Sequence, residues 1–360
     1  MGEREAMAGV IRLAGFEALA RTTLETVSFD YIAGGSWDEV SLAENEAAWG
    51  RRRFRPRVLV DVAAVDPSTT LVGSPSSLPL AIAPMAVQGL AHPDGEIAVA
   101  RAAAVAGVPF ALSTLSSCSI EDVAAAAPDA TRWFQLYVQR DRGLSRSFVE
   151  RAAASGARAI VLTVDLPVLG YRERDLRSGF ALPPLGNFAA IRPSHRAAPG
   201  GDPEAMGSDP SAKTLTWDDL GQIRSWSTMP LVLKGIMTAE DARLAIEHGA
   251  DAIVVSNHGA RQLDRLPAPV DVLAEVAMAV DGRAEVWVDG GVRCGLDIAI
   301  ALALGARGVL LGRPVLWALA AGGQAGVERA LAIMRQEFEL ALALLGAPTP
   351  ADIRPEHLAG

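Results

Sequence analysis

The sequence predicts a single (β/α)8 barrel of parallel strands, preceded by an N-terminal segment. From residue 78 onward, short apolar runs alternate with alanine-rich helical stretches. The runs are rich in Val, Ile and Leu, as expected for parallel strands that are buried on both faces. Eight such strand–helix units follow one another, which favours a closed barrel over an open sheet. No G-x-G-x-x-G follows the first run, which weighs against a dinucleotide-binding fold.

The predicted strands are short, and each ends in polar or glycine residues. They comprise residues 78–84, 109–114, 132–138, 159–165, 231–235, 252–257, 285–291 and 308–313. Helices are expected between most of them, most clearly at 95–107, 238–249 and 295–305. Thr238 followed by acidic residues is a typical helix start, and Gly249 and Gly305 are typical helix ends.

The chain is interpreted as one domain over residues 1–360, with the barrel at 78–346. A bare barrel takes about 250 residues, so the extra length must form additions to it. Residues 1–77 are expected to form helices and a cover over the barrel mouth. Residues 179–213, rich in Pro, Gly, Ser and charge, are expected to form a flexible loop after the fourth strand, on the active-site face, and to act as a lid.

Composition excludes several classes of function. The net charge of −9 and the lack of a basic face argue against nucleic-acid binding. An arginine cluster at residues 51–57 is either a solvated segment or a subunit contact. The two cysteines show neither metal-site nor disulfide spacing, so no metal is expected. Without a signal peptide or a membrane-spanning window, a cytoplasmic protein is expected.

Polar residues gather at the predicted C-terminal ends of the strands, where barrel enzymes of this kind carry out their chemistry. Each one could be structural on its own, as a helix cap or a buried hydroxyl. Together they would cost stability if they had no function. These strand ends carry Pro84, Met85, Ala86, Ser113, Gln135, Tyr137, Thr163, Asp165, Lys234, Ser256, Asn257, His258, Asp289, Gly290, Gly291, Arg293, Gly312 and Arg313.

The segments after the seventh and eighth strands predict a phosphate site. They read DGGVRCG (289–295) and GRPV (312–315). Their glycines let backbone N–H groups approach an anion, and Arg293 and Arg313 can bind phosphate through two hydrogen bonds each. Asp289 can hold hydroxyl groups of a ribityl or ribose chain. The pattern indicates a phosphorylated ligand, either FMN or a sugar phosphate.

The segment SNHGARQLD (256–264) carries a histidine and an arginine on a glycine-containing loop. His258 can act as a base near neutral pH. Arg261 can bind a carboxylate with a planar pair of hydrogen bonds. At a barrel mouth, this pair is interpreted as functional.

Five segments carry a family resemblance: SNHGARQLD, LTVDLPVLGYRERD (162–175), FQLYV (134–138), LVLKG (231–235) and VDGGVRCG (288–295). Together they resemble the FMN-dependent L-2-hydroxy acid oxidases, and within them the 4-hydroxymandelate oxidases of actinobacterial peptide-antibiotic pathways. The resemblance extends from residue 29 to residue 346, nearly the whole chain. It implies FMN as cofactor, a small 2-hydroxy acid as substrate, and a homo-oligomer, often a tetramer.

The resemblance also implies catalytic roles. His258 would take a proton from the substrate while two electrons pass to the flavin, and Asp165 would orient the imidazole. Tyr137 would hydrogen-bond the substrate oxygen. Lys234 would place a positive charge beside the flavin ring.

For substrate binding, Arg261 matches the carboxylate-binding arginine, assisted by Tyr31 and Arg172. The remaining matches are family flavin contacts. Those at the ring are Pro84, Met85, Ala86, Ser113, Gln135, Thr163 and Ser256, and those at the ribityl phosphate are Asp289, Gly290, Gly291, Val292, Arg293, Gly312 and Arg313.

Leu115 departs from the pattern, because glycolate oxidase has a bulky tryptophan there. A smaller apolar residue, with Met85 on the same rim, favours a mandelate-type substrate. Ala86 resembles the oxidases, so O2 is the expected electron acceptor. Three alternatives stay open: an oxidase or dehydrogenase of aliphatic hydroxy acids, a sugar-phosphate enzyme with a Schiff base on Lys234, and a flavin-binding protein without catalysis.

Overall fold

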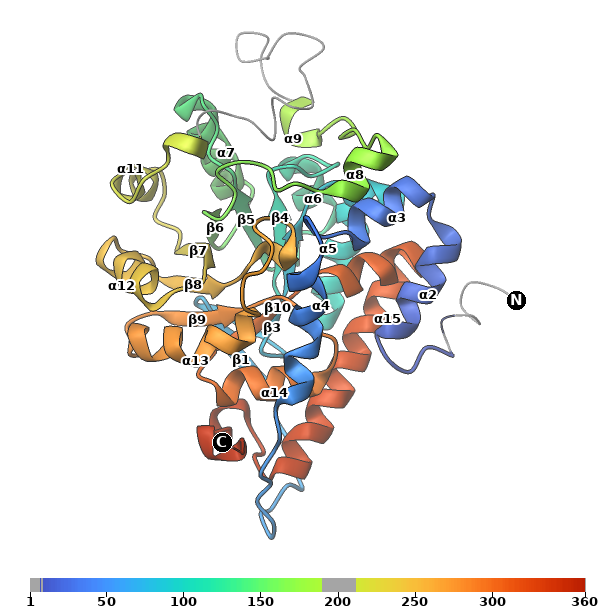
Figure 1. Cartoon of the computed structure of the whole chain (residues 1–360), viewed down its shortest axis with the longest axis vertical. Helices are drawn as coiled ribbons and strands as arrows, with labels where there is room; N and C mark the ends of the chain where they lie inside the picture. Colours follow the sequence, from blue (N-terminus) through green and yellow to red (C-terminus); the bar gives the residue numbers. More distant parts are fainter. Residues whose placement is uncertain (1–6, 8, 190–211, 360) are drawn as a thin grey trace.

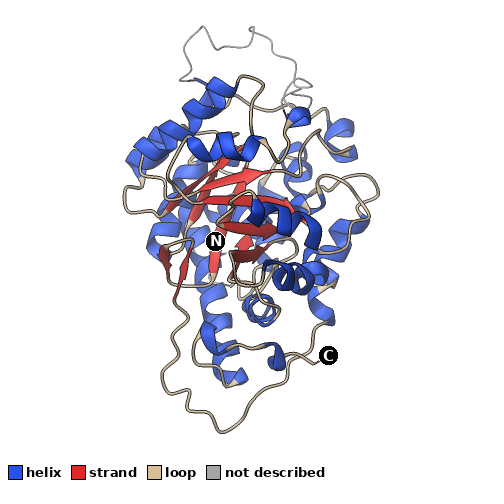
Figure 2. Cartoon of the chain, turned by 90° about the vertical axis from the view of Figure 1, so that its left-hand side faces the viewer, coloured by secondary structure: helices blue, strands red, loops and turns tan. Residues whose placement is uncertain are grey.

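A closed barrel of eight parallel strands forms the centre of the molecule, in the order β10-β3-β4-β5-β6-β7-β8-β9. The computed structural model describes residues 7, 9–189 and 212–359. Helices surround the strands on all sides (Figures 1 and 2), which confirms the predicted fold class. The strands are β3 (Leu80–Met85), β4 (Phe110–Ser113), β5 (Arg132–Leu136), β6 (Ile160–Thr163), β7 (Leu231–Ile236), β8 (Ala252–Val255), β9 (Glu285–Val288) and β10 (Gly308–Leu311).

The helices of the barrel alternate with these strands as the sequence predicted. Thr238 starts α12 as expected, because its side chain accepts a hydrogen bond from the backbone N–H of Asp241 (3.2 Å). The barrel helices are α5 (Gly95–Ala106), α6 (Ile120–Ala126), α7 (Arg142–Ala154), α8 (Glu173–Ser178), α11 (Asp219–Ser225), α12 (Ala239–Glu247), α13 (Pro269–Val280), α14 (Gly295–Ala303) and α15 (Arg313–Leu345).

Several strands end before their predicted limits. The run predicted over 132–138 ends as β5 at Leu136. The backbone N–H of Tyr137 donates to Oγ1 of Thr114 (3.0 Å) rather than to a neighbouring strand. This frees the residues after the strand to reach the barrel mouth.

The N-terminal segment contacts both ends of the barrel. Helix α2 (Ala14–Thr23) packs against α15, while α3 (Thr26–Ala33) and α4 (Val40–Ala47) lie near the loops that follow the strands (Figure 1). A hairpin of β1 (Thr69–Leu71) and β2 (Ser74–Ser76) was not expected. Its residues Leu71 and Val72 are buried in the barrel interior together with Trp133 and Trp287, away from the mouth that the whole segment was expected to cover.

The segment predicted as a loop over 179–213 is partly helical. Residues 186–189 form α9 (Gly186–Ala189), and Ala212–Thr214 form a short 3-10 turn. Asn187 anchors α9, because its buried Nδ2 donates to the carbonyl oxygens of Ser113 (3.1 Å) and Thr114 (3.0 Å). Residues 190–211, most of the segment predicted to act as a lid, lie outside the described residues.

Two apolar clusters make up the core. The smaller one fills the barrel, where Trp133 and Trp287 meet edge to face with ring centroids 5.4 Å apart. The larger one lies between the strands and the surrounding helices. Among the described residues, no helix is both long and apolar enough to span a bilayer.

Candidate active site

A cavity of about 1020 Å³ opens at the C-terminal ends of the strands. The structure brings most of the predicted site residues to its wall. Asp165, Gln135 and Ser256 do not line it but lie directly behind residues that do. The predicted residues on the wall are Tyr31, Pro84, Met85, Ala86, Ser113, Leu115, Tyr137, Thr163, Arg172, Lys234, His258, Arg261, Asp289, Gly290, Gly291, Val292, Arg293, Gly312 and Arg313.

His258 lies on a tight left-handed turn after β8. The φ angles of His258, Gly259 and Ala260 are 58°, 61° and 62°, a conformation that costs non-glycine residues about 1 kcal/mol or more each. Two side chains hold the turn. The hydroxyl of Ser256 accepts from the backbone N–H of His258 (3.1 Å), and Oδ1 of Asn257 accepts from that of Ala260 (3.1 Å).

Asp165 orients the His258 ring from behind. Nδ1 of His258 lies 2.8 Å from Oδ1 of Asp165, so the neutral ring carries its proton on Nδ1 and presents Nε2 as an acceptor. Burial lowers the pKa of His258, and this effect outweighs the opposing effect of the Asp165 carboxylate. Burial raises the pKa of Asp165, but the interactions with His258, including its hydrogen bond, and the charge of Lys234 outweigh this effect and leave the pKa lowered.

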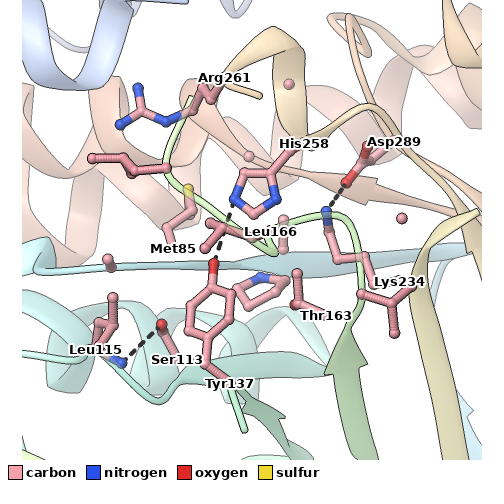
Figure 3. A pocket seen from close by; sticks show the side chains of 18 of the residues that line it. Met85, Ser113, Leu115, Tyr137, Thr163, Leu166, Lys234, His258, Arg261 and Asp289 are labelled. Carbon is pink, nitrogen blue, oxygen red and sulfur yellow. Dashed lines mark hydrogen bonds and ion pairs between the residues drawn. The ribbon is translucent and has the colours of Figure 1, made fainter. Parts of the chain in front are cut away.

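Tyr137 points directly towards His258 in the cavity (Figure 3). Its hydroxyl is 3.4 Å from Nε2 of His258. Burial raises the pKa of this phenol well above its usual range, so Tyr137 stays protonated and can donate a hydrogen bond. The two side chains thus present a donor and an acceptor to the same space.

Lys234, at the end of β7, is held between two groups. Its Nζ donates to the hydroxyl of Ser256 (2.8 Å) and lies 3.1 Å from Oδ2 of Asp289. Burial lowers the pKa of Lys234, but the carboxylates of Asp289 and Asp165 raise it to a greater extent. The amine therefore stays charged, which does not favour a Schiff-base role.

Arg261 extends along the opposite wall towards α3. Its Nη1 donates to the carbonyl oxygens of Tyr31 (2.6 Å) and Gly34 (3.0 Å). Its guanidinium also lies over the Tyr31 ring, 4.7 Å from the centroid. Tyr31 in turn stacks on Phe180 at 4.0 Å. These contacts fix the arginine by one edge and leave its other edge for an anion.

Hydrogen-bonded polar side chains connect the ends of β4, β5 and β6. Oε1 of Gln135 accepts from the hydroxyl of Ser113 (3.1 Å), and its Nε2 donates to Oγ1 of Thr163 (3.0 Å). The hydroxyl of Ser113 also accepts from the backbone N–H of Leu115 (3.1 Å). Gln135 therefore orients two wall residues without reaching the cavity itself.

The predicted phosphate segments have partners within the chain. The Nη2 of Arg293 pairs with Glu46, 2.5 Å away. Arg313 donates from Nε to the carbonyl oxygen of Ile32 (2.9 Å) and from Nη2 to those of Gly34 and Gly259 (both 2.9 Å). Burial lowers the pKa of Arg313 to about 9, and the nearby charge of Arg261 adds to the effect.

Three polar residues that the sequence did not single out support these loops. Asn45 in α4 and Asn257 exchange two side-chain hydrogen bonds of 2.9 and 2.8 Å. Asp264 accepts from the backbone N–H groups of Val40 (3.3 Å) and Ser41 (2.8 Å) at the start of α4. No local signal indicates the Asn45 pair, because its partners are 212 residues apart. Gln262, the third, bonds the loop that follows β6.

The cavity suits a charged, hydroxyl-bearing ligand such as FMN. Oδ1 of Asp289 is buried without a hydrogen-bond partner among the described residues. A buried carboxylate oxygen of this kind requires a donor, and the hydroxyls of a ribityl chain are donors. Lys234, Arg293 and Arg313 supply positive charge on the same wall. In the part of the chain that the structure describes, no group of acidic, histidine or cysteine side chains could hold a metal ion.

Comparison with known proteins identifies the family. A model described as FMN-dependent dehydrogenase matches residues 20–360. The chain belongs to this family. An L-lactate oxidase of Nostoc sp. is 49% identical over 98% of this chain and 99% of the relative. A glycolate oxidase of Spinacia oleracea is 46% identical over 96% and 94%.

Solved structures of the FMN-dependent family agree with the fold. A crystal structure of mandelate oxidase has a TM-score of 0.89 and 44% identity, over 97% of this chain and 98% of that one. A structure of mandelate oxidase with (S)-4-hydroxymandelic acid gives a TM-score of 0.88 and 43% identity over the same shares. The predicted family and its FMN cofactor are thus confirmed, and the chain is an FMN-dependent 2-hydroxy acid oxidase by family.

Proposed function

We propose that this FMN-dependent enzyme oxidises an aromatic (S)-2-hydroxy acid, (S)-mandelate or 4-hydroxymandelate, to the 2-oxo acid. O2 would be the electron acceptor and H2O2 the second product. The observation that carries the proposal is the apolar wall around Leu115. Met85, Leu166 and Phe180 line the same cavity, and apolar and aromatic side chains of this kind favour an aryl group over a charged one.

The residues have complementary roles in this proposal. FMN, when bound, supplies the two-electron acceptor. Nε2 of His258 accepts a proton from the substrate, and Asp165 stabilises the imidazolium that results. Tyr137 donates a hydrogen bond to the substrate oxygen from the same side. Lys234, which stays charged, balances negative charge that develops on the cofactor.

The substrate carboxylate is assigned to two arginines. The free edge of Arg261 can form a planar pair of hydrogen bonds, and Arg172 lies next to it on the cavity wall. The Tyr31 ring supports Arg261 from below its plane. The phosphate of FMN is assigned to Gly290, Gly291, Val292, Arg293, Gly312 and Arg313, and the ribityl hydroxyls to Asp289.

An aliphatic substrate is the second candidate. It is favoured by the 49% identity to an L-lactate oxidase, which exceeds the 44% identity to mandelate oxidase. The two candidates differ in the size of the group that must fit beside Leu115. Hydrophobic pockets discriminate by only about 1–3 kcal/mol per methylene, so turnover of both acids must be compared directly.

The test is an anaerobic titration of the flavin-loaded protein followed by absorbance. (S)-Mandelate, 4-hydroxymandelate and L-lactate are added separately, and air is then readmitted. Bleaching by the aromatic acids with rapid recovery in air supports the proposal. Bleaching by L-lactate alone overturns the aromatic assignment, and slow recovery overturns O2 as acceptor. The variant Leu115→Trp should no longer oxidise the aromatic acids but should still oxidise L-lactate.

A tetrameric assembly and a place in peptide-antibiotic biosynthesis belong to the same proposal. Both rest on the sequence resemblance. Light scattering of the purified protein tests the first, since a monomer would contradict it.

A further inference from the structure

Gln262 connects the two loops that carry the proposed proton acceptor and carboxylate site. It follows Arg261 directly and is only 7% exposed. Its Nε2 donates to the carbonyl oxygens of Val168 (2.7 Å) and Asp165 (3.2 Å). Its Oε1 accepts from the backbone N–H of Gly170 (3.3 Å) and from Nη2 of Arg172 (3.2 Å).

These four bonds use the full capacity of a glutamine amide, which has two donor hydrogens and two acceptor lone pairs. All four partners lie between residues 165 and 172, the loop that follows β6. Gly170 lets this loop approach closely, because a Cβ there would come within 2.4 Å of the Arg261 carbonyl oxygen. A buried amide with no spare bond fixes the distance between the two loops.

The contact with Arg172 also helps to hold two positively charged side chains next to each other. Arg172 and Arg261 are two positive groups beside one cavity, and burial together with the Arg261 charge lowers the pKa of Arg172 to about 10. Arg172 is held there by hydrogen bonds to neutral oxygens, from Nε to the Arg261 carbonyl (3.1 Å) and from Nη2 to Gln262. Neither of these acceptors is an anion, so the two hydrogen bonds hold Arg172 without neutralising it. The nearby anion that acts on the charges of Arg172 and Arg261 is the Asp175 carboxylate, which lines the same cavity.

We propose that Gln262 is a positioning residue that sets Arg172 for the substrate carboxylate and Asp165 for His258, by tying the loop at 165–172 to the loop at 256–264. The inference rests on the substrate role of Arg172 proposed above. A neutral amide is required at this position, because a carboxylate would repel the Val168 and Asp165 carbonyl oxygens and would neutralise Arg172.

The test compares Gln262→Glu, which preserves the shape, with Gln262→Met, which preserves the length without any polar atom. The probe is phenylacetate, a carboxylate without the reactive hydroxyl, titrated against the absorbance of the flavin-loaded protein. Both variants should weaken phenylacetate binding about tenfold or more and raise KM similarly, as expected when a buried bond to a charged group is lost. The Kd of FMN should change by less than about twofold.

The control is Gln336→Glu, the same change at an exposed position of α15, which should leave the phenylacetate Kd unaltered. The background variant Arg172→Met separates the two proposals. If Arg172→Met weakens phenylacetate binding, adding Gln262→Glu to that variant should weaken binding little more, because both substitutions act on the same interaction. If Arg172→Met has no effect, the proposed role of Arg172 is wrong, and the inference fails with it.

If Arg172→Met weakens binding while both Gln262 variants bind phenylacetate normally, the inference alone is wrong. Equal weakening by Gln262→Glu with and without Arg172 would also contradict it. Failure of both Gln262 variants to fold would overturn a positioning role, since the tie between two loops should leave the barrel intact.

Discussion

At the residue scale, His258 is fixed at three points. Its ring bonds Asp165, its backbone N–H bonds Ser256, and its left-handed φ angle is maintained by the turn that Asn257 closes. The imidazole therefore needs little rearrangement before it accepts a proton. Such preorganisation is what a general base contributes beyond its pKa.

Replacing His258 by alanine should strongly slow the substrate-dependent bleaching of the flavin. Loss of general-base catalysis typically lowers rates by about 10²–10⁴-fold. FMN should remain bound, because the groups assigned to its phosphate lie on other loops. Stopped-flow absorbance measures the reduction, and flavin content after gel filtration is the control. Reduction at the wild-type rate would remove His258 from its proposed role.

The pH dependence follows from the direction of the His258 pKa. Burial lowers it below the ordinary value of 6.5, and a proton acceptor must be neutral. We therefore expect kcat/KM to fall as pH decreases through a value below 6.5 and to be level at pH 7. A pH profile of kcat/KM from 4.5 to 8 measures this; a half-maximal point above 6.5 would contradict it.

At the element scale, α4 supports the mouth of the barrel from outside. Asn45 bonds Asn257 beside the histidine turn, and the backbone oxygen of Asn45 lies so close to Gly291 that a Cβ there would be 1.8 Å away. The start of α4 is in turn fixed by Asp264. One short helix thereby braces the loops of both the proposed base and the phosphate.

Asp264→Ala should lower the free energy of unfolding by about 1 kcal/mol, because it removes an acceptor for two N–H groups at a helix start. Asp218→Ala is the control for removal of an aspartate from an exposed helix start, since Asp218 precedes α11 without a side-chain cap bond. Urea denaturation compares the two. A loss at Asp218 equal to that at Asp264 would show that the cap bonds contribute nothing specific.

Site residues could be predicted where a single sequence segment contains the recognisable residue types. They could not be predicted where they depend on hydrogen bonds to residues far away in the sequence. His258, Arg261 and Lys234 could be placed at the cavity because each stands at the end of a predicted strand or on the loop that follows one. The connections made by Asn45 and Gln262 could not be found, because their partners are about 90 to more than 200 residues away in sequence. The pairing of Arg293 with Glu46 was missed for the same reason.

At the scale of the whole molecule, the site residues and the hairpin that completes the core lie in different parts of the barrel. The cavity lies at the C-terminal ends of the strands, while the hairpin of β1 and β2 closes the interior elsewhere. Its Val72 N–H donates to the Glu285 carboxylate, which also accepts from Nε1 of Trp287 (3.1 Å). The hairpin therefore belongs to the barrel core rather than to the mouth.

Leu71→Ala should destabilise the protein by about 2–5 kcal/mol, because Leu71 is fully buried and its removal leaves a cavity. The KM for substrate and the turnover per bound flavin should stay at wild-type values, since Leu71 does not line the site. Thermal unfolding and steady-state kinetics measure the two quantities. A raised KM would show that the two regions are coupled.

The barrel itself was predictable from the sequence, because eight buried strands produce a repeating apolar signal. The predicted strand boundaries differed by a few residues where a side chain takes the place of the backbone of the neighbouring strand as hydrogen-bond partner. The hydroxyl of Thr114 does so for the backbone N–H of Tyr137. The hairpin was missed, because its strands are three residues long and one contains Pro75. Helix α9 was missed because its anchor, Asn187, bonds backbone atoms more than 70 residues away.

The turn at His258 has a consequence for how the protein fluctuates. Active-site loops usually belong to the parts of a protein that open most easily. Here the backbone N–H groups of His258 and Ala260 are bonded to buried side chains that are themselves held by the barrel and α4. Their amide hydrogens should therefore exchange with solvent as slowly as those of β8. Local opening of this loop would then require partial unfolding of the barrel.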